Sequence, residues 1–146
     1  YYLEDTDGNV SSSYDQLIAL GPNLKGLGLS SGTDLNISYS QWQASKDTLL
    51  SLAYGVAPGS TKAAYKFNLS DVSAQDAVGS VSGDLPPYNT NTSTIFADTL
   101  VKTVTVKDTA AEISANWDAL QTEFTTIKTV PSFLIALSTS SELNNS

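Results

Sequence analysis

The sequence predicts an α/β domain in which short, mainly parallel strands alternate with helices and stack as a strand–helix repeat solenoid. Three observations predict this class. Residues 104–120 have the pattern of a strand, a helix cap and an amphipathic helix, a similar stretch occurs near the N-terminus, and strand-like alternation recurs between the two. Short strands joined by helical crossovers pair in parallel. Units that each bury one face against the next form a solenoid.

The clearest strand and cap lie at residues 103–112. Residues 103–106 alternate polar and apolar β-branched side chains, which is typical of a half-buried strand. Asp108 and Thr109 are favoured helix N-cap residues, and Glu112 lies three positions after Thr109. This is the capping-box spacing, in which each side chain of the pair satisfies a backbone N–H of the other. We therefore expect a strand over residues 102–107 and a helix over residues 110–122.

The apolar face of that helix is formed by Ile113, Trp117 and Leu120, at positions i, i+4 and i+7. Such spacing places the three side chains on one side of a helix. Tyr14 takes the position of Trp117 in the N-terminal copy. We expect both rings to pack in the core, because large aromatic rings on an amphipathic face are usually buried.

The N-terminal copy lies 103 positions earlier, with Asp5 aligned on Asp108 and no gap. Residues 3–6 match residues 106–109 in pattern. The later matches are residues of the helix: Val10, Tyr14, Asp15 and Leu17 align with Ile113, Trp117, Asp118 and Leu120. Overlooking an internal repeat leads to a wrong assignment of the whole fold. The match between the two segments therefore carries much weight in the predicted fold. It predicts a strand over residues 1–4 and a helix over residues 7–19.

The chain between and after the two copies supplies the other elements. A turn is expected at residues 21–23, where Gly, Pro and Asn follow one another. Alternating apolar residues predict strands over residues 24–29, 65–69 and 133–137, and helical spacing predicts helices over residues 40–54 and 73–78. Residues 30–36 and 55–61 are expected to be loops. The Leu-x-x-Leu-x-Leu spacing of residues 24–29 is similar to that of leucine-rich repeats. Gly32 stands where those repeats place a buried Asn, so the analogy concerns architecture alone.

One segment interrupts this pattern. Residues 79–94 are rich in Gly, Pro, Asn, Ser and Thr, which predicts an exposed loop or insertion. Tyr88 lies there beside two prolines, and Asn89 and Asn91 follow it. We interpret these three residues as a possible contact surface.

The stretch VKDTAAEISANWDAL resembles the Asp-Thr-Ala-Ala-x-Ile strand–helix repeats of very large secreted bacterial surface proteins of the RTX or adhesin-like kind. Residues 24–53 and 65–78 are similar to further strands and helices of the same family. The resemblance implies a scaffold role in an extracellular or cell-surface protein, with no activity of its own. The whole chain, residues 1–146, is then expected to be a single repeat-built domain. We also expect it to be a fragment of a longer polypeptide, since it starts in a strand and ends where another loop and helix begin.

Composition limits the classes of partner. The charged fraction is 15%, against roughly 25% in typical soluble domains, and about a quarter of the residues are Ser or Thr. The net charge of −8 disfavours nucleic acid and anionic membranes, which are also negative. No apolar run reaches the length of a membrane span. The chain has no Cys, so no disulfide or thiol chemistry is expected.

Asp5, Asp7 and Asn9 have the 1-3-5 spacing of a calcium loop. That motif requires a bidentate carboxylate at its twelfth position, where this chain has Gln16. The alignment of the two copies instead places Asp5 at a helix cap. Helix capping is therefore the preferred interpretation and calcium binding the alternative.

The sequence contains no catalytic constellation. It has no His, which is the commonest general base, and no Gly-x-Ser-x-Gly elbow. We therefore predict a non-enzymatic assembly module of a secreted or cell-surface bacterial protein, such as an adhesin, a surface layer or an extracellular filament. Its expected partners are neighbouring repeats or identical copies. The alternative hypothesis is a module that binds a surface glycan or calcium.

Overall fold

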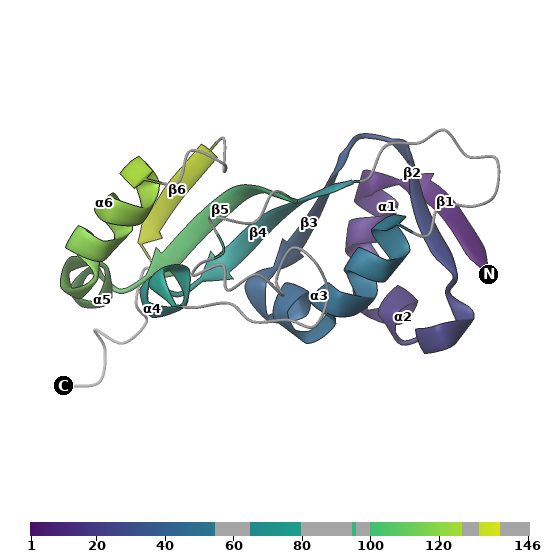
Figure 1. Cartoon of the computed structure of the whole chain (residues 1–146), viewed down its shortest axis with the longest axis horizontal. Helices are drawn as coiled ribbons and strands as arrows, with labels where there is room; N and C mark the ends of the chain where they lie inside the picture. The colour runs from purple at the N-terminus through teal and green to yellow at the C-terminus, as the bar shows by residue number, and fades with distance from the viewer. Residues whose placement is uncertain (55–64, 80–94, 96–99, 127–131, 138–146) are drawn as a thin grey trace.

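The computed structural model describes residues 1–54, 65–79, 95, 100–126 and 132–137, which form an elongated α/β arrangement (Figure 1). Two small sheets hold its strands. β1 (Tyr2–Thr6) pairs with β2 (Gly26–Ser31). The second sheet has the order β3 (Asp34–Ser38), β4 (Lys66–Val72), β5 (Val101–Asp108) and β6 (Ser132–Leu137). Every pairing between these strands is parallel, which confirms the predicted α/β class and the predicted strand direction.

Helices connect the strands. The chain forms α1 (Asp7–Ser12), α2 (Tyr14–Ile18), a short 3-10 turn (Gly21–Asn23), α3 (Tyr39–Tyr54), α4 (Ala74–Val78), α5 (Ala110–Ala115) and α6 (Trp117–Thr126). In Figure 1, α3, α4 and α5 lie below the four-stranded sheet, while β1 and β6 lie at opposite ends of the long axis. The helices predicted at residues 40–54 and 73–78 are thus confirmed.

The loop predicted over residues 30–36 is wrong. β2 continues to Ser31, and β3 begins only three residues later at Asp34. Leu35 and Ile37 are buried while Asn36 between them is exposed, so the segment has the period of a half-buried strand. Gly32, with φ of 75°, turns the chain between the two strands, and its turn signal concealed the alternation that follows.

Each of the two long helices predicted at residues 7–19 and 110–122 is broken into two. The breaks fall at Ser13 (φ −104°, ψ 13°) and at Asn116 (φ −103°, ψ 6°). Both conformations lie near the sparsely populated bridge region. At the second break the Asn116 side chain donates to the carbonyl oxygen of Glu112. Such local side-chain bonds compete with continued helix, and the axis changes direction there.

The main core lies between the four-stranded sheet and its helices. It is formed by the inward residues of neighbouring strands together with helix residues: Leu35, Ile37, Phe67, Leu69, Val104, Val106, Tyr39, Trp42, Ala74, Ala77, Ile113 and Leu120. Trp42 is fully buried, and its ring stacks on Tyr39 with centroids 5.7 Å apart. Burial of such large rings contributes much of the apolar stabilisation.

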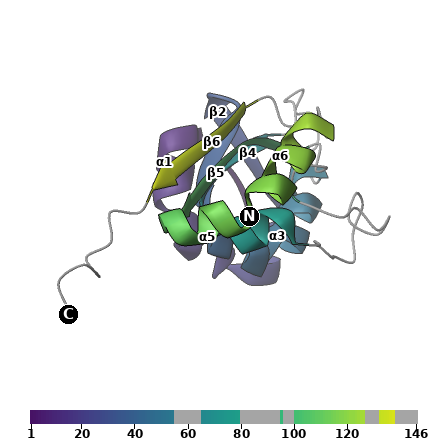
Figure 2. The same ribbon diagram turned by 90° about the vertical axis from the view of Figure 1, so that its left-hand side faces the viewer.

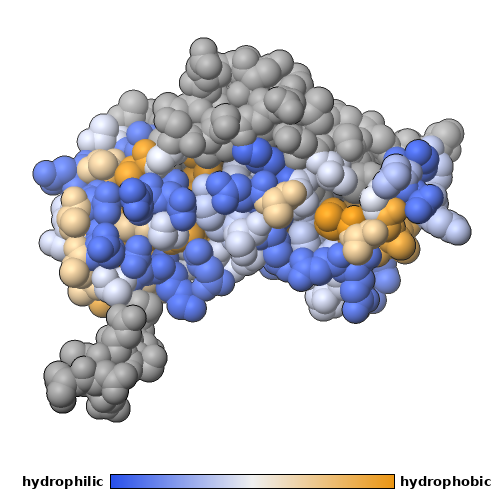
Figure 3. Space-filling model, turned by 90° about the horizontal axis from the view of Figure 1, so that it is seen from below, coloured by the Kyte–Doolittle hydropathy of each residue, from blue (hydrophilic) through white to orange (hydrophobic). Residues whose placement is uncertain are grey.

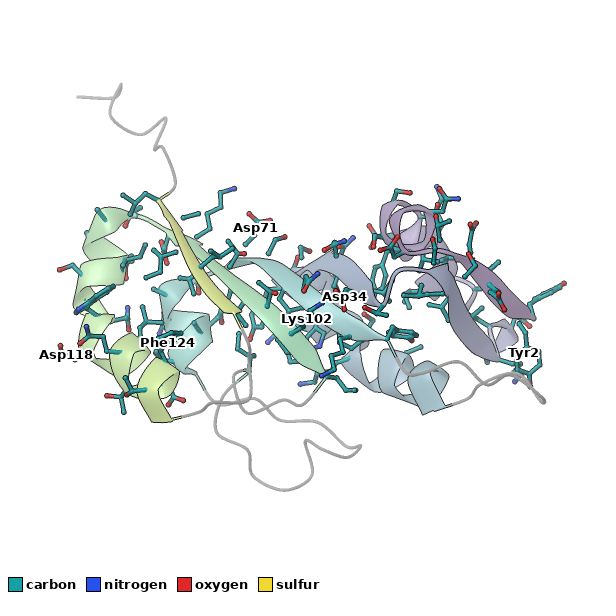
Figure 4. All side chains as sticks on the ribbon, turned by 90° about the horizontal axis from the view of Figure 1, so that it is seen from above. Tyr2, Asp34, Asp71, Lys102, Asp118 and Phe124 are labelled. Carbon is teal, nitrogen blue, oxygen red and sulfur yellow. The ribbon has the colours of Figure 1, made fainter. Side chains whose placement is uncertain are left out.

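The opposite face of this sheet is polar. Asn36 and Asn68 are paired across β3 and β4, and the Asn68 amide donates to Asn36 Oδ1 at 2.9 Å. Lys102 pairs with Asp34 across the width of β4 (Figure 4). Lys107 also bonds Asp71, at 2.9 Å, and this bond holds the pKa of the Asp71 carboxyl below its usual range. The face of the sheet directed away from the helices therefore carries polar and charged side chains suited to contact with solvent.

The bend at Gly32 generates a testable prediction. Replacement of Gly32 by Ala should lower the free energy of unfolding by at least about 1–2 kcal/mol, because a side chain with positive φ is strained and the new Cβ would collide with the Asp7 carboxylate. Urea denaturation measures the change.

The matched control is Gly8→Ala, since a Cβ at Gly8 meets nothing within 4 Å. This change lies in α1 and should leave stability unchanged or raise it by up to about 1 kcal/mol. Equal losses for the two variants would contradict the strain argument. The double change Gly32→Ala with Asp7→Ala should recover the part of the loss that comes from the collision.

Candidate functional site

The same type of helix cap occurs after four strands. In each case a Ser or Thr side-chain oxygen accepts the backbone N–H of the residue three positions later. The four pairs are Thr6 with Asn9, Ser38 with Gln41, Ser73 with Asp76 and Thr109 with Glu112, at 3.0–3.2 Å. The residue four positions after each cap is buried, namely Val10, Trp42, Ala77 and Ile113. The cap thus fixes where each helix begins and which side chain it directs into the core.

The first and last of these caps agree in further detail. Asp5 accepts the N–H of the next residue at 2.7 Å, and Asp108 does so at 2.8 Å. Only half of the capping box predicted at Thr109 is therefore formed: Thr109 accepts the Glu112 N–H, but the Thr109 N–H is donated to Asp108 and not to the Glu112 side chain. The six-residue helices α1 and α5 follow, and each ends at a single break residue. Tyr14 and Trp117 are consequently the first residues of equivalent second helices, α2 and α6.

The surroundings of these two rings differ. Tyr14 is only 2% exposed. Its hydroxyl bonds the Ser45 hydroxyl of α3, and its neighbour Asp15 accepts from the Gln41 amide of α3 at 2.9 Å. Trp117 is 43% exposed, so the prediction that it packs in the core is wrong. The physical reason is that α3 covers Tyr14, whereas no helix in the described part of the chain covers Trp117 in the same way.

An apolar groove lies beside Trp117 at this end of the molecule. Its volume is about 360 Å³, and it is lined by residues of α6 and β6: Trp117, Leu120, Gln121, Phe124 and Ile135. Leu137, which shares its face of β6 with Ile135, is 62% exposed and extends the apolar area, whereas Leu134, 57% exposed, lies on the opposite face of the strand beside Thr105. Figure 2 shows α5, α6 and β6 from this end. The residues of the groove and Leu137 together form what we term the α6–β6 surface.

The two edges of the four-stranded sheet differ in how they are covered. At the β3 edge, α1 lies alongside the strand, and Ser11 accepts the backbone N–H of Asn36 at 3.0 Å. At the other edge, β6 pairs with β5 and with no further strand among the described residues. An open strand edge is a template for pairing with another chain. The α6–β6 surface therefore combines apolar side chains with an available backbone edge.

The opposite end of the molecule also exposes large apolar residues. Tyr1, Tyr2 and Leu20 are all exposed. Tyr2 lies at the far end from Phe124 and Asp118 in Figure 4. The view from below shows apolar residues gathered in two separate areas, one toward each end, with hydrophilic residues between them (Figure 3). Exposed apolar area of this kind commonly marks interaction surfaces.

The residues predicted as a calcium site belong to the first cap. Asp5 accepts from the Asn9 amide at 2.9 Å, while Asp7 accepts the backbone N–H of Gly8. The bond from Asn9, and then that from the Thr6 N–H, lower the pKa of the Asp5 carboxyl. Within the described ranges no group of three or more His, Cys, Asp or Glu side chains is placed to hold a metal ion.

The other predicted contact residues cannot be placed. Tyr88, Asn89 and Asn91 lie outside the described residues, as does all of the predicted 79–94 loop except Gly79.

Sequence reasoning missed a polar groove of about 520 Å³ on the outer face of the sheet. Its lining combines amide and hydroxyl groups from three strands and the start of α3, including Asn36, Gln41, Asn68, Ser70 and Thr105. The side-chain oxygen of Asn68 is buried there without a hydrogen-bond partner. The sequence did carry a signal, because Asn36 and Asn68 each stand at the centre of an alternating segment. Using that signal required knowing that the two strands pair.

Unequal burial of the two rings predicts unequal effects of truncation. Tyr14→Ala should lower the free energy of unfolding by about 3–5 kcal/mol, as for other large buried rings. Trp117→Ala should cost at most about half as much, because much of its ring is already in water. Chemical denaturation of both variants checks this, and equal costs would show that the rings are equally packed.

Burial also predicts a dependence of stability on alkaline pH. Burial raises the pKa of Tyr14 to about 12, partly offset by the Ser45 bond, and burial raises the pKa of Tyr65 as well. The folded state therefore favours the neutral hydroxyls. This contribution is complete below pH ~10, the value of an unfolded tyrosine, and is lost as pH rises toward 12. The free energy of unfolding should fall across that window, and less steeply in Tyr14→Phe than in the unaltered protein.

None of the helices in the described part of the chain combines the length and apolarity required of a membrane span. Comparisons of this chain with protein-family models, with curated proteins and with solved structures found no match. The candidate site therefore rests on the geometry of the α6–β6 surface.

Proposed function

We propose that this chain is a non-enzymatic structural module, built of strand–helix units, that assembles with neighbouring units or copies through its α6–β6 surface. The observation that carries the proposal is the exposure of Trp117, whose counterpart Tyr14 is buried by a neighbouring helix. A ring left uncovered beside an open strand edge and exposed leucines is suited to a partner that supplies the missing cover.

The spacing of the four caps supports a repeat solenoid. They fall at residues 6, 38, 73 and 109, which is a recurrence of roughly 35 residues, within the range of known repeat architectures. In such proteins each unit contacts mainly its neighbours, and an uncapped end exposes the surface that the next unit would cover. The departures from regularity are the bend at Gly32 and the separate pairing of β1 with β2.

The proposed setting is the surface of a bacterial cell or a secreted filament, as an adhesin or surface-layer repeat. The Ser- and Thr-rich, acidic, Cys-free composition supports this setting, together with the resemblance of residues 106–120 to Asp-Thr-Ala-Ala-x-Ile repeats. A net charge of −8 keeps separate molecules apart at low ionic strength, because like charges repel.

Self-association tests the proposal. The sedimentation coefficient of the isolated chain should rise with protein concentration, and more strongly at ~0.5 M than at ~0.02 M NaCl, because salt screens repulsion between acidic molecules. Leu137→Lys places a charge on the α6–β6 surface, on the same face of β6 as Ile135, and should abolish the rise.

The control is Gln43→Lys, which adds the same charge at an exposed position of α3 and should associate as the unaltered chain does. A chain that sediments as a monomer at all concentrations and both salt levels, or association that Leu137→Lys leaves intact, would refute assembly through this surface.

A second candidate function is glycan binding by the polar groove on the sheet. The buried, unpaired oxygen of Asn68 favours it, since such a group is costly unless a donor reaches it. No aromatic ring is among the residues that line the groove, so recognition would depend on hydrogen bonds. Calorimetry with oligosaccharides, comparing the unaltered chain with Thr105→Ala, tests this candidate. Absence of binding would remove it.

A further inference from the structure

The contact between α2 and α3 shows how a strand–helix unit of this chain covers the ring of the preceding one. The first two turns of α3 lie against the start of α2. Gln41, three positions after the Ser38 cap, donates its amide to Asp15 at 2.9 Å. Ser45, four positions further along the same helix, is buried and bonds the Tyr14 hydroxyl. An amide residue and a small hydroxyl residue, one turn apart on α3, thus contact an Asp and the aromatic residue that precedes it on α2.

The same pair of side chains is presented at the C-terminal end. Trp117 and Asp118 are the first two residues of α6, just as Tyr14 and Asp15 are the first two of α2. The breaks that precede them, at Ser13 and Asn116, have nearly identical dihedral angles. Trp117 and Asp118 are both exposed. The docking pattern is therefore repeated, while the helix that would occupy it is not among the described elements.

We propose that the α6–β6 groove binds the N-terminal half of an α3-type helix from another strand–helix unit. This inference rests on the proposed assembly function and names the partner element. The partner helix has a Ser or Thr cap, a Gln three positions later that bonds Asp118, and a small hydroxyl residue seven positions after the cap that lies on Trp117. Indole N–H groups only donate, so the hydroxyl oxygen of the partner accepts from Trp117.

The dimensions of the groove suit a helix. α6 has ten residues, or about 15 Å of helix, which is twice the length of α2. Phe124 and Ile135 supply an apolar wall along the groove. A partner helix that filled it would cover apolar area on both sides, with Gln121 at its polar margin and Asp118 beside it on the adjoining surface of α6. Interfaces commonly have this arrangement of an aromatic centre and a polar rim.

A peptide with the sequence of residues 38–54 is the probe. It carries Trp42→Phe, so that it does not fluoresce strongly, and a staple on its solvent side, because isolated helices of this length are marginal in water. It is titrated into the full chain below the concentration at which the chain associates. Since Trp42 of the chain is fully buried, quenching by acrylamide reports on Trp117. Binding should protect Trp117 from quenching in a saturable manner.

Variants of both partners make the test specific. Asp118→Asn should weaken peptide binding roughly tenfold, because the charge-assisted hydrogen bond from the Gln amide becomes a weaker one between neutral groups, whereas Glu112→Gln, which removes the same charge on α5, should leave it unchanged. A peptide with Gln41→Glu should fail to bind, since its carboxylate would meet Asp118. Trp117→Ala should abolish binding, measured by anisotropy of a labelled peptide.

The outcomes separate this inference from the assembly proposal. Saturable binding with the expected variant pattern supports the helix-binding groove, even if the chain itself remains monomeric. Failure of the stapled peptide to bind, or binding that neither Asp118→Asn nor Trp117→Ala weakens, overturns it. If the chain self-associates in a manner that Leu137→Lys abolishes and yet does not bind the peptide, the assembly function stands and the identity of the partner helix is wrong.

Discussion

The helices that follow the capped strands have apolar sides that neighbouring elements must cover, and the rest of the structure follows from that constraint. A Ser or Thr cap fixes the start of each helix, and the residue four positions later enters the core. α1 and α3 contact the strands that precede them, whereas α4 contacts the following strand, β5. Tyr14 is covered by α3. Burial of apolar side chains against neighbouring elements, and not any single bond, is what stabilises such a fold.

The same constraint explains why the two edges of the larger sheet differ. At β3 the chain turns back at Gly32, so that α1 lies along the edge and Ser11 satisfies a backbone N–H that would otherwise face outward. At β6 the strand edge, the exposed leucines and Trp117 occur together. A closed edge protects against unwanted pairing, while an open apolar edge invites it. The two edges of the sheet therefore differ, and an assembly that joined copies through the β6 edge would extend along the long axis.

Polar chemistry is concentrated on the outer face of the sheet. The Asn36–Asn68 pair and the ion pairs of Lys102 and Lys107 cross several strands there. Exposed ion pairs add little stability. Their charged groups keep the outer face of the sheet solvated, so the apolar core forms on the side covered by the helices. The acidic excess of the chain adds long-range repulsion, which short-range apolar contacts between copies would have to overcome.

Local chemistry by itself determined much of this protein. The caps at Thr6 and Thr109 and the alternation of β4, β5 and β6 could be predicted, because cap geometry and side-chain periodicity depend on neighbours within a few positions. The β3 strand was missed, because Gly32 suggested a loop. The helix breaks at Ser13 and Asn116 were also missed, since Ser and Asn are tolerated inside helices.

Only the tertiary structure decided that Tyr14 is buried and Trp117 is not. Their local sequences are equivalent, and burial depends on which helix, distant in sequence, lies against each ring. Whether each ring is buried is therefore decided by tertiary packing and not by the sequence around it.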